Sequence, residues 1–102
     1  MEEKIKILIV DDEPRVADEI EEFLHTRDYI VSKANAPSKA FKILKKDSVN
    51  IVILDIKLPE MDGIEVLKKI KALYPDIEVI MISGHGDMEI VIQAMRYGAT
   101  DY

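Results

Sequence analysis

The sequence predicts an α/β fold in which helices cover a parallel β-sheet. Four short apolar runs of strand length alternate with four segments of helical periodicity. Three of the four runs consist almost entirely of Ile, Val, Leu and Met, which is typical of strands covered on both faces. Parallel strands joined through single helices form right-handed crossovers, so we expect one doubly wound domain over residues 1–102.

The expected strands differ in how apolar they are. The second run, YIVSKA, is the most polar and suits a strand near one edge of the sheet. The last four residues, Ala99–Tyr102, follow the final helical pattern and are expected to approach a further strand. In chain order, the four expected strands are Ile5–Val10, Tyr29–Ala34, Asn50–Leu54 and Ile77–Ile82.

The helical segments carry apolar residues three and four positions apart. Pro37 is tolerated in a first helical turn, Pro75 ends the third segment, and Gly98 is placed as a C-terminal stop. In the first segment, the apolar stripe consists of Val16, Ile20, Phe23 and Leu24. The expected helices are Pro14–Arg27, Pro37–Lys46, Gly63–Tyr74 and Asp87–Tyr97.

The composition excludes several functional classes. With 102 residues, of which 48% are hydrophobic, the chain can bury a core without metal or disulfide support. A formal net charge of −6 argues against nonspecific DNA or RNA binding by this segment. The absence of cysteine excludes disulfides, thiol nucleophiles and thiolate metal sites. The N-terminal apolar run is too short for a signal peptide or a membrane span, so we expect a cytoplasmic protein.

Acidic residues follow two strands that we expect to be neighbours. In the flavodoxin-like strand order 2-1-3-4-5, the first and third strands meet where the order reverses, and ligands bind beyond their carboxyl ends. Asp11 and Asp12 follow the first strand, and Asp55 follows the third. Three carboxylates in one cleft repel one another unless a cation neutralises them. Because these ligands are oxygen atoms, the cation indicated is Mg²⁺ or Mn²⁺.

Such a site suits phosphoryl chemistry. A bound cation leaves coordination positions for phosphate oxygens and draws charge from an incoming phosphoryl group, so a carboxylate oxygen can attack phosphorus. Ser83, at the end of the fourth strand, could donate its hydroxyl to a phosphoryl oxygen. Each residue also has a simpler interpretation: Asp12 could cap the first helix, and Asp55 could end its strand in an Asx turn. The segment Leu58–Gly63 could be a turn that starts a helix. The joint pattern favours the functional interpretation.

Four segments resemble a response-regulator receiver domain of two-component signalling. The resemblance implies a CheY-like sheet of order 2-1-3-4-5 and a switch driven by phosphorylation. The SGHGD stretch is similar to receivers of NtrC-like transcriptional regulators, although FixJ-like receivers have a similar stretch. The matching segments are ILIVDDEP at Ile7–Pro14, VILDIKLPEMDG at Val52–Gly63, VIMISGHGD at Val79–Asp87 and AMRYGATDY at Ala94–Tyr102.

The resemblance assigns roles position by position. It implies that Asp55 is the phosphoacceptor and that Asp11 and Asp12 are the acidic pair that holds Mg²⁺. The backbone carbonyl of Lys57 is implied as a further ligand. The implied phosphoryl donor is a histidine kinase, and the implied target is an attached output domain or another protein. The domain is then a substrate and switch rather than an enzyme.

The resemblance also bears on the C-terminal part. It implies that Ser83 is the hydroxyl residue that moves toward the phosphoryl group, and that Tyr102 is the aromatic switch residue. Family members continue with a strand that ends in Lys-Pro and a fifth helix, and this lysine pairs with the phosphoryl group. We expect that strand and helix to be largely missing here: the chain is a fragment or a deliberate truncation, or a disordered remainder follows.

A missing fifth strand would have physical consequences. The strand Ile77–Ile82 would be a bare apolar edge, and packing on the first and fourth strands would be partly uncovered. We therefore expect self-association or strand exchange between chains. The alternative function is a truncated receiver that acts only as a structural or interaction module and is poorly phosphorylated. A flavin-type cofactor binder is disfavoured, because the acidic loop DDEP is no phosphate cradle, and no P-loop or GxGxxG occurs.

Overall fold

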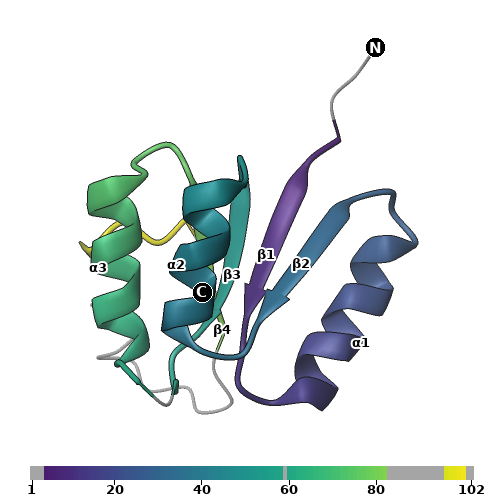
Figure 1. Ribbon diagram of the computed structural model, residues 1–102, viewed down its shortest axis with the longest axis horizontal. Coiled ribbons are helices and arrows are strands. Elements are labelled where there is room, and N and C mark those ends of the chain that lie inside the picture. The colour runs from purple at the N-terminus through teal and green to yellow at the C-terminus, as the bar shows by residue number, and fades with distance from the viewer. Residues whose placement is uncertain (1–3, 59, 83–95, 101–102) are drawn as a thin grey trace.

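The computed structural model describes residues 4–58, 60–82 and 96–100 (Figure 1). Strands and helices alternate as expected, and the element boundaries lie within a few residues of the predicted ones. Most of the fourth expected helix lies outside the described residues. The elements are β1 (Lys6–Val10), α1 (Pro14–His25), β2 (Ile30–Ala34), α2 (Pro37–Lys46), β3 (Ile51–Asp55), α3 (Gly63–Leu73) and β4 (Glu78–Ile82).

The four strands form one parallel sheet in the order β2-β1-β3-β4, which confirms the predicted arrangement of these strands. The register places Val10 of β1 beside Leu54 of β3, and Asp55 beside Ile82 of β4. The carboxyl ends of the three strands therefore lie at one edge of the sheet. Because Val10 pairs with Leu54, Asp11, which follows β1, lies beside Asp55, the last residue of β3.

The main hydrophobic core lies between the sheet and the helices α2 and α3. Alternate residues of the strands are fully buried there and meet apolar residues of the two helices. Burial of one large aliphatic side chain is worth about 1.5–3 kcal/mol, so this layer holds the strand ends in place. From the strands, the core takes Leu8, Val10, Val52, Leu54, Val79 and Met81; from the helices, it takes Ala40, Leu44, Val66, Leu67 and Ile70.

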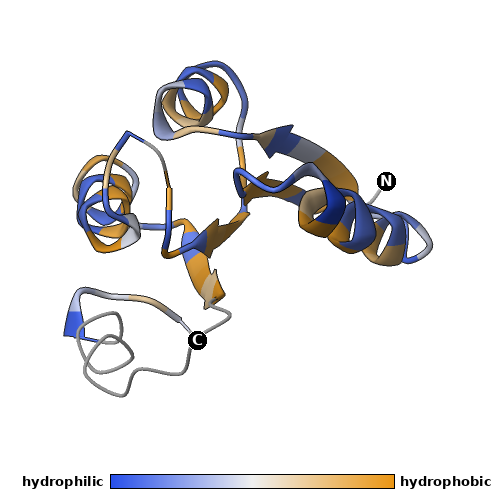
Figure 2. Cartoon of the chain, turned by 90° about the horizontal axis from the view of Figure 1, so that it is seen from below, coloured by the Kyte–Doolittle hydropathy of each residue, from blue (hydrophilic) through white to orange (hydrophobic). Residues whose placement is uncertain are grey.

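The opposite face of the sheet is covered less completely. Figure 2 shows α1 on the side of the sheet opposite α2 and α3. Ile7 and Ile9 of β1 are buried there, at 4% and 0% exposure, so the expectation that the first strand is partly uncovered is wrong. Phe23 of α1 is 56% exposed. The half-buried strand residues of this face belong to the other three strands; they are Val31, Ile51, Ile53, Ile80 and Ile82.

Residues 96–100 pack against β4. Gly98 has a φ of +101°, in the region that favours glycine, as its predicted place after a helix requires. Ala99 is buried, and the Thr100 N–H donates to the Val79 carbonyl oxygen at 2.7 Å. The Thr100 hydroxyl also donates to the carboxylate of Glu78. The outer edge of β4 is thus paired at this point and is less bare than the sequence suggested.

Within the described part of the chain, no helix combines the length and the apolar character that crossing a membrane requires.

Candidate metal centre

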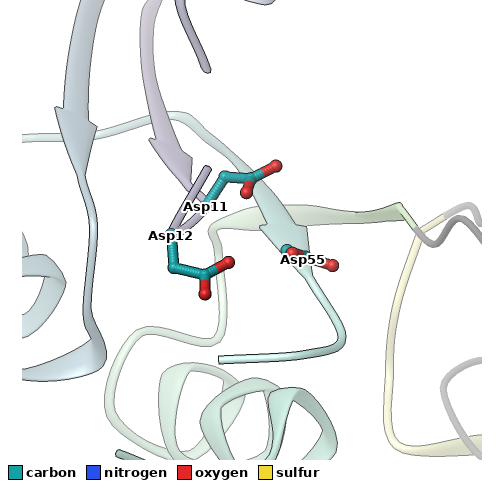
Figure 3. A group of neighbouring side chains, drawn as sticks. All are labelled: Asp11, Asp12 and Asp55. Atoms are coloured by element: carbon teal, nitrogen blue, oxygen red, sulfur yellow. The ribbon is translucent and has the colours of Figure 1, made fainter. Parts of the chain in front are cut away.

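Three carboxylates meet at the carboxyl edge of the sheet. Asp11, Asp12 and Asp55 each offer one oxygen atom, and these atoms lie within 4.8 Å of one another. Figure 3 shows the three side chains gathered beyond the ends of β1 and β3. The structure therefore brings together the three acidic residues that the sequence predicted to share a cleft.

Asp11 is fixed by its own backbone and by the start of α1. Its N–H donates to the Ala34 carbonyl oxygen at 3.1 Å, which continues the β1–β2 ladder by one residue. Its Oδ1 accepts from the Glu13 N–H at 2.9 Å. With 4% exposure, it is the one charged residue in the buried class among the described residues. A buried carboxylate with so few donors is costly unless a cation supplies the missing interactions.

Asp12 does not cap the first helix. The residue at the cap position is Glu13, and no side-chain cap bond is made there. Pro14 occupies the first helical position, where its missing N–H costs nothing. Asp12 is exposed and turns its carboxylate into the cluster. The simpler interpretation of Asp12 is therefore wrong, and its carboxylate is available to a ligand.

Asp55 is the last residue of β3. Its Oδ1 accepts from the Lys57 N–H at 3.3 Å, so it makes the local turn contact expected of an Asx residue and also belongs to the cluster. Burial raises the pKa of the Asp55 carboxyl, and the hydrogen bond from the Lys57 N–H lowers this pKa in part. The charges of Asp11 and Asp12 raise the pKa further. A cation in the cluster would favour the ionised form.

The loop after Asp55 depends on a glycine. The Gly63 N–H donates to the Ile56 carbonyl oxygen at 2.8 Å, so the start of α3 folds back against the end of β3. A Cβ at position 63 would stand 2.5 Å from the Ile56 Cα and 2.6 Å from the Asp55 carbonyl oxygen. Asp62 caps α3, because its Oδ1 accepts from the Ile64 N–H at 2.9 Å. Leu58–Gly63 therefore leads into a helix, as the simpler interpretation expected. The hydrogen bond from Gly63 to Ile56 also holds the end of this loop against the residue that follows Asp55.

A second contact of this loop was not foreseen. The Glu60 carboxylate accepts from the Ser38 N–H at 2.8 Å and from the Ser38 hydroxyl at 3.1 Å. These hydrogen bonds lower the pKa of Glu60. The two residues are 22 positions apart, and no pattern in the sequence links one to the other. We refer to this pair of hydrogen bonds as the Glu60–Ser38 clamp.

A shallow groove of about 280 Å³ runs beside Asp11, between α1 and the start of α2. Lys33 and Lys39 both line it. The Lys33 Nζ is paired with Asp18 at 2.7 Å and Glu21 at 3.0 Å, and hydrogen bonds to these carboxylates raise the pKa of Lys33. Lys33 is therefore held by α1 rather than turned toward the carboxylate cluster.

The donor set fits a hard divalent cation. Carboxylate oxygens are the preferred ligands of Mg²⁺, which keeps several waters and binds through one or two carboxylates. The buried carboxylate of Asp11 is the observation that most favours a cation here. The carbonyl of Lys57 stays a predicted ligand. Ser83 and Tyr102 lie outside the described residues, so their predicted roles stay predictions as well.

Comparison with known proteins places the chain in a family. The model of the response regulator receiver domain matches residues 7–102. A response regulator of Rickettsia bellii described as NtrX-like is 43% identical over 100 residues, covering 96% of this chain. The C4-dicarboxylate transport transcriptional regulatory protein DctD of Rhizobium meliloti is 34% identical over 96 residues, covering 94% of this chain. The chain spans 21% of the length of each of these two relatives.

Solved structures agree with this comparison. A CheY-like response regulator receiver domain protein from Methanospirillum hungatei is 31% identical, with a TM-score of 0.93 over 98% of this chain and 80% of that protein. The BeF3-activated receiver domain of DrrB is 27% identical, with a TM-score of 0.89 over 98% of this chain and 83% of that domain. This chain belongs to the response regulator receiver domain family.

Proposed function

We propose that this chain is a signalling switch that takes a phosphoryl group on Asp55 beside a bound Mg²⁺ ion. The observation that carries the proposal is the convergence of Asp11, Asp12 and Asp55, with Asp11 buried, in a member of the receiver family. Mn²⁺ would fit the same oxygen ligands. The relatives named above are a response regulator and a transcriptional regulatory protein, which supports a role in regulation.

The chemistry assigned to Asp55 is nucleophilic. One carboxylate oxygen attacks the phosphorus of a phosphohistidine on a histidine kinase, so a P–O bond forms while the P–N bond breaks. The imidazole leaves and takes up a proton. When bound, Mg²⁺ supplies positive charge to the phosphoryl oxygens. Asp11 and Asp12 would hold the ion, and the Lys57 N–H orients the Asp55 carboxylate.

Phosphorylation would change the charge at the carboxyl edge of the sheet. A phosphoryl group adds close to two negative charges and strong acceptor oxygens. The surface that we propose to respond is the expected fourth helix with the adjoining strand β4, and Ser83 and Tyr102 would transmit the change. The partners would be a histidine kinase and an output domain or other protein. On this proposal, the chain is a substrate that switches rather than an enzyme.

Intact-mass measurement tests the proposal directly. The chain would be incubated with acetyl phosphate and Mg²⁺, and we expect the added mass of one phosphoryl group. Asp55→Asn should abolish the adduct, whereas Asp62→Asn, on the same loop and outside the cluster, should retain it. Loss of the adduct in EDTA would support the metal requirement. An adduct that persists in Asp55→Asn would refute the assignment of the phosphoacceptor.

A further inference from the structure

The first turn of α2 has no cap of its own. Its N-cap residue is Ala36, whose side chain cannot accept a hydrogen bond, and the first helical position is Pro37. Helix N-termini leave backbone N–H groups without intrahelical partners, and they favour negative charge. Glu60 meets both needs from another part of the chain, since its carboxylate accepts the Ser38 N–H and hydroxyl.

The same carboxylate belongs to the loop that carries the metal centre. Glu60 lies five positions after Asp55 and three after Lys57, whose carbonyl is a further predicted ligand. The start of this loop is tied to Asp55 through the Lys57 N–H, and its end is tied to α3 through Asp62. Among the hydrogen bonds of the described residues, the Glu60–Ser38 clamp is what links the middle of the loop to α2.

We propose that Glu60 is a positioning residue for the metal centre, and that its clamp on Ser38 couples occupancy of that centre to the first turn of α2. The proposal rests on the proposed function, because it needs a cation at Asp55. Coupling between two sites is reciprocal. If the clamp favours the loop conformation that binds Mg²⁺, then bound Mg²⁺ must strengthen the clamp to the same degree.

The contact is more than an exposed ion pair. It joins two segments 22 residues apart, uses both carboxylate oxygens and ends on a backbone N–H of a helix. Two acceptor oxygens on two fixed donors restrict the loop more than a single charge pair does. Both residues are exposed, so the energetic coupling should be modest.

Four variants distinguish the effect of the clamp's hydrogen bonds from the effect of the negative charge of Glu60. Ser38→Ala removes one of the two donors and changes no charge. Glu60→Asp keeps the charge but shortens the reach, whereas Glu60→Gln removes the charge and keeps an acceptor. Glu19→Gln, on the exposed face of α1, is the control for loss of one negative charge. The stability of each variant would first be measured by urea unfolding in EDTA. This shows that each variant is folded, so that a change in Mg²⁺ affinity is not caused by unfolding.

Mg²⁺ alone is titrated into the whole chain while amide signals and amide hydrogen exchange are followed by NMR. We expect Mg²⁺ to slow exchange of the Ser38 amide in the wild type. Ser38→Ala should weaken Mg²⁺ binding about twofold and Glu60→Asp about threefold, as befits exposed hydrogen bonds to a charged group. The control Glu19→Gln should bind Mg²⁺ as the wild type does.

The outcomes distinguish the two proposals. If the wild type binds Mg²⁺ while Ser38→Ala and Glu60→Asp bind it equally well, the coupling is refuted and the proposed function stands. An effect confined to Glu60→Gln would mean a long-range charge effect and would also overturn the coupling. If the wild type does not bind Mg²⁺, both proposals fail together.

Discussion

Replacement of Asp55 by Asn should stabilise the metal-free protein. Asn retains an oxygen that can accept the Lys57 N–H, so the local turn is preserved. What the substitution removes is a negative charge whose pKa is raised by burial and by two neighbouring carboxylates. The functional residue is therefore also a source of instability in the absence of a cation, as is common for groups that are placed for chemistry rather than for packing.

The size of the effect follows from the distances. Two unit charges separated by 4.8 Å repel by about 0.9 kcal/mol in bulk water, and by more where water is partly excluded. The water-like value is the appropriate one here, because Asp55 is only partly buried. Repulsion from Asp11 and Asp12 then sums to roughly 1–2 kcal/mol, with partial screening by salt. For a domain of this size, that corresponds to a rise in Tm of roughly 5–10 °C.

The gain should depend on pH in a defined direction. The folded-state pKa of Asp55 lies above its ordinary value of 3.8. Below 3.8 the carboxyl is neutral in both the folded and the unfolded state, so wild type and Asp55→Asn should be equally stable. Between 3.8 and the folded-state pKa, the unfolded chain ionises more readily than the folded one, so the wild type loses stability relative to the variant. The difference should be complete once the pH exceeds the folded-state pKa.

Thermal and urea unfolding, followed by far-UV circular dichroism in EDTA, measure this difference. Asp62→Asn serves as the matched control, because Asn also caps helices well and position 62 lies outside the cluster. Addition of Mg²⁺ should stabilise the wild type and have little effect on Asp55→Asn. At ten times the dissociation constant, the stabilisation is about 1.4 kcal/mol. A variant no more stable than the wild type in EDTA would refute the electrostatic reasoning.

Three further outcomes are expected. Gly63→Ala should cost about 1–3 kcal/mol in urea unfolding, because a Cβ would stand 2.5 Å from the Ile56 backbone; a stability equal to wild type would contradict the close approach. Leu67→Ala should cost about 2–5 kcal/mol, since Leu67 is fully buried between α3 and the sheet, and a loss below 1 kcal/mol would place it outside the core. Since Thr100 pairs with the outer edge of β4 at Val79, the chain should self-associate at micromolar concentration through the rest of that edge, and introduction of a charge by Ile80→Lys should reduce this; a monomer by light scattering would rule it out.

The pattern of apolar residues carried the fold prediction because strands and helices differ in period. Continuous runs such as that of β3 need cover on both faces, which requires helices between parallel strands. The sequence placed every described strand and helix to within a few residues. It failed for the cover of β1: Ile7 and Ile9 are buried on the side of the sheet where α1 packs. Helix placement over one strand is a matter of tertiary packing that periodicity does not encode.

The carboxylate cluster was predictable for a topological reason. In a parallel sheet, residues that follow adjacent strands arrive at one edge, so adjacency of β1 and β3 brings Asp11 and Asp55 together. The sequence could not show which of the three acidic side chains is buried. Only the structure showed that Asp11 is buried whereas Asp12 is exposed, because burial depends on which neighbouring elements close over each side chain.

By itself, then, the sequence determined the alternation of strands and helices and identified the acidic residues that follow β1 and end β3. The alternation follows from local periodicity, and the order of the strands from the resemblance to receiver domains; parallel strands share a carboxyl edge, so that order brings the acidic residues together. The tertiary structure alone decided the Glu60–Ser38 clamp and the need for glycine at position 63. Both depend on distances of a few ångströms between segments that the chain brings together only after folding, and no residue pattern records such distances.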